Sequence, residues 1–337
     1  MPQFHATPWR TIAAASLLFA IMPPVHAQQP ASGLLTIKSE NDSYSVFSDS
    51  DGHYTNGVEA IWSFEPEAQH WLHRVAAILP GWRDSGLDGG AYRLTHQMYT
   101  PEEIRIPRLV EDDRPYAGLL LGGISLFDNV PHAGWREARS LNLDVGLVGP
   151  ASGAELLQRE FHEVIAADKP RGWDHQLNNE PVVNLAYKHA WIDRASVAGL
   201  DLEYGPRLGF ALGNLYTYAA SGLGLRLGSN LDASFGIPAI APAQGGWSYF
   251  RPDQDFNWSA FASLEGRYIA HNLLLDGNTF EDSHSVDREE WVGDALIGVA
   301  LSWDRWQLSL AHAWRTKEFA SQNAHHAFGS LTLSRWF

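Results

Sequence analysis

Hydrophobic and polar residues alternate along most of the chain. From Leu141, apolar side chains occupy every second position, and polar or small residues lie between them until Gly149. Alternation of this period turns one face of a β-strand toward an apolar environment and the other toward a polar one. It predicts twelve strands, near residues 33–43, 53–65, 91–100, 115–128, 138–149, 181–194, 199–213, 216–227, 257–270, 289–303, 306–316 and 326–337.

The segment after the fifth predicted strand has a helical pattern instead. Ser152 is followed three residues later by Glu155, the spacing of a capping box in which each side chain satisfies a backbone N–H at the helix start. Pro170 cannot continue a helical hydrogen-bond ladder. We therefore expect a short helix over residues 152–167.

Three polar side chains accompany this helix. Gln158 and His162 are four residues apart and share one face, and Asp168 lies just past the last turn. An imidazole, an amide and a carboxylate that lie together suit acid–base catalysis or metal binding. The alternative is a helix that packs on a strand and contains a hydrogen-bonded histidine with no chemical role.

The first residues have the pattern of a signal peptide. Arg10 precedes an apolar run over residues 12–22, and Ala27 closes a cleavage-site pattern. We expect residues 1–27 to be removed and residues 28–337 to form a single domain. No later apolar run reaches the ~18 residues of a membrane-spanning helix.

Composition narrows the function classes. The chain has no cysteine, which excludes disulfides and thiol catalysis. It has 24 basic and 39 acidic residues, a balance that argues against nucleic acid as a partner. An acidic surface of this kind fits proteins that hold divalent cations.

The strand pattern and the aromatic residues favour an outer-membrane protein. The chain has 14 Trp, many near the ends of predicted strands, as an interfacial girdle requires. Its last segment alternates up to Phe337. We predict a transmembrane antiparallel β-barrel of about twelve strands with both termini on the periplasmic side. A soluble β-sandwich is the alternative, since its strands also alternate.

An even strand count also predicts where the polar residues lie. The connections after strands one, three and five would share the extracellular end. The first contains Asn41, Asp42 and Thr55, the second contains Arg105 and Arg114, and the third is the predicted helix.

One connection does not fit this topology. Residues 228–256 form a long connection at the end where short turns are expected. Either the strand count is wrong there, or this segment folds into or under the barrel.

Each of these residues also has an ordinary structural interpretation. Asp42 can be a turn former and Thr55 a common strand residue. Arg105 and Arg114 can be solvated loop residues, although the phosphates of lipopolysaccharide would also bind them. Asp113 and Arg114 can form an internal ion pair that fixes the loop.

Several motifs together resemble one known family. The order and spacing of these motifs are similar to those of the outer-membrane lipid A 3′-O-deacylase family of the LpxR type. The matching motifs are END at 40–42, YTNG at 54–57, MYTP at 98–101, DRPYAG at 113–118 and GWxxQ at 172–176.

The resemblance implies a twelve-stranded barrel whose site lies between the wall and the extracellular-side helix after strand five. It implies calcium-dependent hydrolysis of the 3′-linked acyloxyacyl ester of lipid A in the outer leaflet, and it implies roles for five residues. The catalytic base would be His162, with Asn41 beside it. Asp42, Thr55 and Asp168 would complete the catalytic set and bind Ca²⁺.

The implied partner is lipid A of lipopolysaccharide in the outer leaflet, and we expect the protein to be a monomer. The family pattern has glutamate where this chain has Asp168. It also has a pair of basic residues in the connection between strands three and four, which in this chain is reduced to Arg105. These differences concern the metal geometry and the contacts to sugar or phosphate. Arg105, Arg114 and Gln158 are the predicted substrate-binding residues, and Gln158 is also placed to orient His162.

The chemistry of these residues agrees with ester hydrolysis. A histidine can take a proton from water, and a cation can stabilise the developing oxyanion. Calcium binds six to eight oxygen ligands, which carboxylates, amides and hydroxyls supply.

Two other functions stay open at this point. An outer-membrane phospholipase A-like lipase would need a nucleophilic serine beside its histidine, and the sequence contains no G-x-S-x-G motif. A non-enzymatic pore would line its lumen with charged residues and would have no use for the helix after strand five.

Overall fold

The alternating segments form the twelve predicted strands. The computed structural model describes residues 32–337 except residues 45–52, 80–81, 83–85 and 235–249. The predicted signal peptide, residues 1–27, lies outside the described residues. The strands are β1 (Gly33–Asn41), β2 (His53–Phe64), β3 (Gly89–Thr100), β4 (Ala117–Pro131), β5 (Trp135–Val148), β6 (Glu180–Val197), β7 (Leu200–Gly213), β8 (Tyr216–Gly228), β9 (Asp253–Asn272), β10 (Trp291–Asp304), β11 (Trp306–Arg315) and β12 (His326–Trp336).

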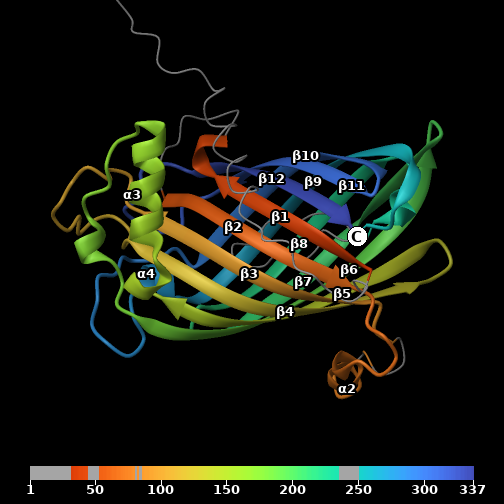
Figure 1. The fold of residues 1–337 in the computed structure, drawn as a ribbon, viewed down its shortest axis with the longest axis horizontal. Helices are drawn as coiled ribbons and strands as arrows, with labels where there is room; N and C mark the ends of the chain where they lie inside the picture. Colours follow the sequence, from red (N-terminus) through yellow and green to blue (C-terminus); the bar gives the residue numbers. More distant parts are fainter. Residues whose placement is uncertain (1–31, 45–52, 80–81, 83–85, 235–249) are drawn as a thin grey trace, which may run out of the picture.

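The strands close into a single antiparallel barrel (Figure 1). Each strand pairs with its sequence neighbours, and β1 also pairs with β12, from Leu34 opposite Trp336 to Asn41 opposite Gly329. Closure satisfies the backbone groups that an open sheet would leave at its edges. The prediction of a twelve-stranded barrel is confirmed.

The two faces of the wall differ as the alternation predicts. Outward positions carry exposed apolar side chains, among them Leu94, Val145 and Leu264. Inward positions carry buried charges that pair between nearby strands: Arg93 contacts Glu59 at 3.2 Å and Asp144 at 2.6 Å. The same arrangement recurs for Arg207 with Glu265 and for Arg315 with Asp294.

The described helices are short. They are α2 (Trp71–Ala76), α3 (Ala154–Ile165) and α4 (Leu273–Asp276), with 3₁₀ turns η2 (Asp42–Tyr44), η3 (Pro150–Ser152), η4 (Trp173–His175) and η5 (Leu231–Ala233). Among the described residues, no helix is long and apolar enough to cross a bilayer.

The connections divide between two ends of the barrel. The connections after β1, β3, β5, β7, β9 and β11 lie at what we call the helix end, which includes α3 and α4 (Figure 1). The opposite end, where β1 begins and β12 ends, is the terminus end. The three polar connections singled out from the sequence therefore share one end.

The start of α3 differs from the predicted capping box. Gly153, with φ +75°, is the N-cap and has no side chain, and the Ser152 hydroxyl accepts only from the N–H of Ala154, at 3.4 Å. Ser152 instead ends the preceding 3₁₀ turn, and its side chain packs against Gly118. The capping prediction was wrong because the left-handed Gly153 separates Ser152 from the helix.

The end of α3 also comes earlier than predicted. Ala166 adopts φ +56°, and its N–H donates to the carbonyls of Glu163 and His162. This left-handed residue ends the helix before Pro170 is reached. The predicted helix over residues 152–167 is therefore α3, shortened at both ends.

The described residues of the long connection after β8 lie at the terminus end of the lumen. Its described residues include Phe250, which packs with inward-facing Leu34 and Trp336. The indole N–H of Trp336 donates to the carbonyl of Phe250 at 2.6 Å. At the other end of the connection, Arg226 donates to the carbonyl of Leu231. The strand count is therefore right, and the second expectation, a segment that folds under the barrel, holds for these residues.

Candidate functional site

Asn41, Asp42 and Thr55 lie together where β1 ends and β2 begins; we call them the Asn41 cluster. The side-chain N–H of Asn41 donates to the carbonyl of Thr55 at 2.8 Å. The amide oxygen of Asn41 accepts from the N–H of Ser43 at 2.8 Å, and a carboxylate oxygen of Asp42 accepts from the same N–H at 2.7 Å. The cluster therefore gathers amide, carboxylate and hydroxyl oxygens at one point of the rim.

A bulge in β2 sets the position of Thr55. The pairing register between β2 and β3 shifts between Tyr54 and Asn56, so Thr55 is the inserted residue. Its hydroxyl lies 2.8 Å from the hydroxyl of Thr100, the last residue of β3. Bulges reorient a side chain at the rim of a barrel. The Thr55–Thr100 contact links the Asn41 cluster to β3.

His162 lies in the last turn of α3 and is held by the backbone that follows. Its Nδ1 is 2.5 Å from the carbonyl oxygen of Asp168. A carbonyl only accepts, so Nδ1 is the donor, and in the neutral ring Nε2 then carries the lone pair. The left-handed Ala166 turns the chain so that Asp168 comes back to the imidazole. The imidazole is thus oriented by a backbone carbonyl.

Gln158 has a different place from the one predicted. It is 2% exposed, and its Oε1 accepts from the indole N–H of Trp173 at 2.7 Å. Trp173 itself is buried against the ring of Tyr116, with 4.9 Å between the ring centroids. This bond fastens the middle of α3 to the segment that follows it, and the Asp168 carbonyl has the orienting role expected of Gln158.

Asp168 and Arg105 meet on the solvent side of the helix exit. The Nε of Arg105 is 3.8 Å from the carboxylate of Asp168, and both side chains are more than half exposed. Arg105 also donates to Glu103 at 2.8 and 2.7 Å. These hydrogen bonds from Arg105 lower the pKa of Glu103 to about 2. The structure therefore brings His162, Asp168 and Arg105 together.

Arg114 does not join them. It is 1% exposed, lies 3.5 Å from Glu318, and stacks over the ring of Tyr99 with 4.5 Å to the centroid. Asp113 stabilises the same loop by accepting from the backbone N–H groups of Glu102 and Arg114. Arg114 thus fixes the connection from inside the barrel mouth, where it is not exposed to lipid.

The helix α3 packs on the outer wall of the barrel. A side chain at Gly118 on β4 would collide with Ser152 and Ala154, so the absence of a Cβ there allows the close approach. His96 on β3 contacts the carbonyl of Ser152 at 3.2 Å. Met98, Tyr116, Ala154 and Trp173 form the buried cluster beneath the helix. Trp173 therefore packs the segment that follows α3 onto the barrel.

Both groups of polar residues lie at the helix end: the Asn41 cluster where β1 ends and β2 begins, and the group of His162 on α3 and its neighbouring connections, which pack on β3 and β4. Asn56, next to Thr55, pairs with Met98, which belongs to the cluster beneath α3. Two strand spacings, about 10 Å, separate β1 from β3. Sequence reasoning missed Gly118 and Thr100, although both stand inside motifs that it quoted.

The donor chemistry of the Asn41 cluster suits a hard cation. Calcium prefers carboxylate, amide and hydroxyl oxygens, all of which are present there. Among the described residues there is no group of three or more His, Cys, Asp or Glu that could hold a metal ion. Any calcium at this site would therefore depend on neutral oxygen ligands as well as on carboxylates.

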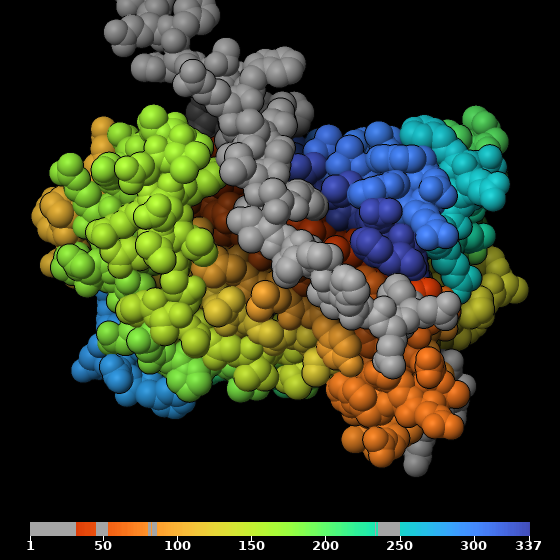
Figure 2. Space-filling view, in the orientation of Figure 1, coloured from red at the N-terminus to blue at the C-terminus, as the bar shows by residue number. Residues whose placement is uncertain are grey.

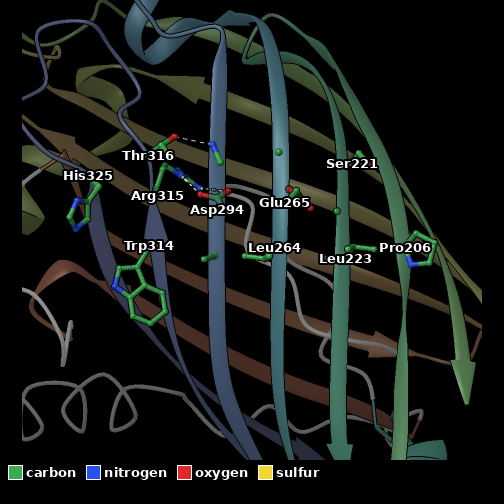
Figure 3. Close-up of a pocket in the computed structure, with 14 residues that line it drawn as sticks. Pro206, Ser221, Leu223, Leu264, Glu265, Asp294, Trp314, Arg315, Thr316 and His325 are labelled. Carbon is green, nitrogen blue, oxygen red and sulfur yellow. Dashed lines mark hydrogen bonds and ion pairs between the residues drawn. The ribbon is translucent and has the colours of Figure 1, made fainter. Parts of the chain in front are cut away.

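A groove of about 660 Å³ lies elsewhere, across β7–β11 (Figure 3). Ser221 pairs with Gly266 and Gly266 with Gly293, so small residues form one row of it. Leu223 and Leu264 line the next row. No predicted site residue lines this groove, so it is not the candidate site.

Comparison with known proteins identifies the family. The family described as outer membrane protein LpxR matches residues 12–337. The chain belongs to the LpxR family. This confirms the resemblance drawn from the motifs and places the protein in the outer membrane.

A solved structure shows the same fold. LpxR from Salmonella typhimurium is similar with a TM-score of 0.77 and 19% identity, over 90% of this chain and 100% of that chain. The beta domain of the Bordetella autotransporter BrkA is similar with a TM-score of 0.45 and 10% identity, over 91% of this chain and 99% of that chain. No curated protein matches the chain.

Proposed function

We propose that this LpxR-family protein removes the 3′-linked acyloxyacyl chain of lipid A by ester hydrolysis, with His162 as general base. One observation carries the proposal. The imidazole is held in a defined tautomer by the Asp168 carbonyl, on a helix that packs on the outer wall of a membrane barrel. A base on the outer wall is within reach of a lipid beside the barrel, whereas a base in the lumen is not.

The surface of α3 supports a lipid substrate. Leu157, Phe161 and Val164 are 50%, 40% and 75% exposed. Their spacing of four and three residues places them on one face of the helix. His162 follows Phe161 directly in the sequence and lies roughly 100° around the helix from this apolar face. An acyl chain that packs along it would bring its ester toward the imidazole.

The proposed step uses water as the nucleophile. The Nε2 of His162 accepts a proton from water as the water oxygen attacks the ester carbonyl. When the tetrahedral intermediate collapses, the bond from the acyl carbon to the sugar oxygen breaks, and the imidazolium returns the proton to that oxygen. The products are the free acyloxyacyl acid and a 3′-hydroxyl group.

We propose Ca²⁺ as the cofactor, held by Asp42, Thr55 and Asp168 with the amide oxygen of Asn41 nearby. The supporting observation is the oxygen donor set of the Asn41 cluster. When bound, the ion supplies Lewis-acid stabilisation of negative charge. Arg105, which is more than half exposed, has free surface for a phosphate or sugar hydroxyl of lipid A.

Mass spectrometry of lipid A from expressing cells tests the function. We expect the intact protein to remove one acyloxyacyl group and His162→Ala to remove none. His175→Ala, an exposed histidine on the same connection, is the matched control and should retain activity. Turnover by His162→Ala would contradict the assignment of the base. Release of phospholipid acyl chains in place of the lipid A chain would favour the phospholipase alternative.

A further inference from the structure

The connection between β2 and β3 packs on the outside of the barrel wall. Leu72 and Ala76 of α2 form a buried cluster with Phe64, Trp82 and Leu126. Phe64 and Leu126 occupy outward positions of β2 and β4. The ring of Phe64 lies 5.2 Å from the ring of outward-facing Tyr92. The segment forms a lobe beside the wall at the terminus end (Figures 1 and 2).

The opposite side of this segment is also apolar. Hydrogen-bonded turns continue α2 as far as Leu79. Trp71 and Ile78, two helical turns apart, are 38% and 81% exposed, and Arg74 between them is exposed. A short helical segment with one apolar face on the barrel and a second one exposed has an unpartnered surface.

The position of the segment determines what covers that surface. It lies beside Trp62 and Tyr92, which pair directly across β2 and β3 and belong to the aromatic residues at the terminus end. Aromatic side chains at the ends of barrel strands lie at the membrane interface. The exposed Trp71 and Ile78 continue the outward apolar surface, and tryptophan beside arginine is typical of interfacial segments.

We propose that residues 65–79 form a membrane foot, whose exposed Trp71 and Ile78 insert into the bilayer leaflet at the terminus end. The partner is phospholipid. Trp71 and Ile78 enter the acyl boundary, and the guanidinium of Arg74 lies among the lipid phosphates. The foot would fix the depth of the barrel in the membrane independently of the chemistry at the helix end.

Site-directed fluorescence tests the foot. The chain has no cysteine, so Ile78→Cys gives a single labelling site for an environment-sensitive fluorophore. Ala133→Cys, at the exposed tip of the turn between β4 and β5, is the control at the same end of the barrel. The full-length barrel is folded into phosphatidylethanolamine–phosphatidylglycerol vesicles with and without brominated acyl chains.

We expect blue-shifted emission from the label at position 78 and loss of its intensity in brominated vesicles, and neither change at position 133. Emission at position 78 equal to that at position 133 would overturn the proposal. So would a blue shift without bromine quenching, because protein and not lipid would then cover the site. Heat-modifiable migration in gels shows that each labelled barrel is folded.

Discussion

At the scale of single residues, a backbone carbonyl orients the imidazole of His162, a role that the sequence analysis gave to the side chain of Gln158. The Asp168 carbonyl orients His162, which leaves the Asp168 carboxylate outside that hydrogen bond. Changes to the Asp168 side chain therefore need not disturb the orientation of the imidazole. This separation allows the metal role of Asp168 to be tested apart from the orientation of the imidazole.

Asp168→Asn keeps the carbonyl and removes the charge. We expect its deacylation activity to need more calcium than that of the unchanged protein and to recover at high calcium, because calcium binds carboxylate oxygens more strongly than an amide. A chelator should stop both proteins reversibly. The measurement is deacylation of lipid A across a calcium titration, and identical titrations would exclude the Asp168 carboxylate as a ligand.

At the scale of elements, α3 depends on a glycine of the wall. The helix has little buried apolar surface of its own, since only Ala154 and Gln158 are buried in it. Its position follows from the close approach at Gly118 and from the Gln158–Trp173 hydrogen bond. The helix can therefore be displaced without unfolding the barrel.

Gly118→Ala tests this dependence. The added methyl group would collide with Ser152 and Ala154, at a cost of about 1–3 kcal/mol for overpacking. We expect reduced deacylation and faster proteolysis within α3, while the barrel keeps its heat resistance. Gly122→Ala, on the same strand, has only a carbonyl at 3.8 Å and should behave like the unchanged protein. Equal activity of the two variants would show that the close approach is not needed.

At the scale of the whole molecule, buried charges join distant strands. Glu318, in the connection between β11 and β12, contacts Arg315 at 3.4 Å and Arg114 at 3.5 Å. Burial alone would raise its pKa, but the charges of Arg315 and Arg114 outweigh burial and lower the pKa of Glu318 to about 2. A lowered pKa means that this carboxylate stabilises the fold above its ordinary pKa of 4.5, and that the contribution disappears as the pH falls toward about 2.

Glu318→Gln should lower the stability of the barrel at neutral pH by about 3–5 kcal/mol, because it leaves the buried guanidinium of Arg114 without the carboxylate of Glu318. The measurement is the temperature at which the folded band is lost in gels. We expect the difference from the unchanged protein to shrink between pH 4.5 and pH 2. A difference that stays constant over this range would contradict the ion-pair role of Glu318.

Local pattern determined the strands and the approximate place of the helix. Period-two alternation depends only on neighbouring residues and on the two environments of a barrel wall, so residues 33–43 and the eleven other segments could be recognised. Shared motifs and strand parity also indicated that Asn41, Thr55 and His162 belong to the same end.

Only the tertiary structure decided which way individual side chains face. Arg114 is directed inward because Glu318, far away in the sequence, reaches it through barrel closure. Gln158 is buried because Trp173 folds back beneath α3, and His162 is oriented by a carbonyl that a left-handed Ala166 brings round. Such contacts depend on register and on close approach between distant segments, which no local pattern of polarity encodes.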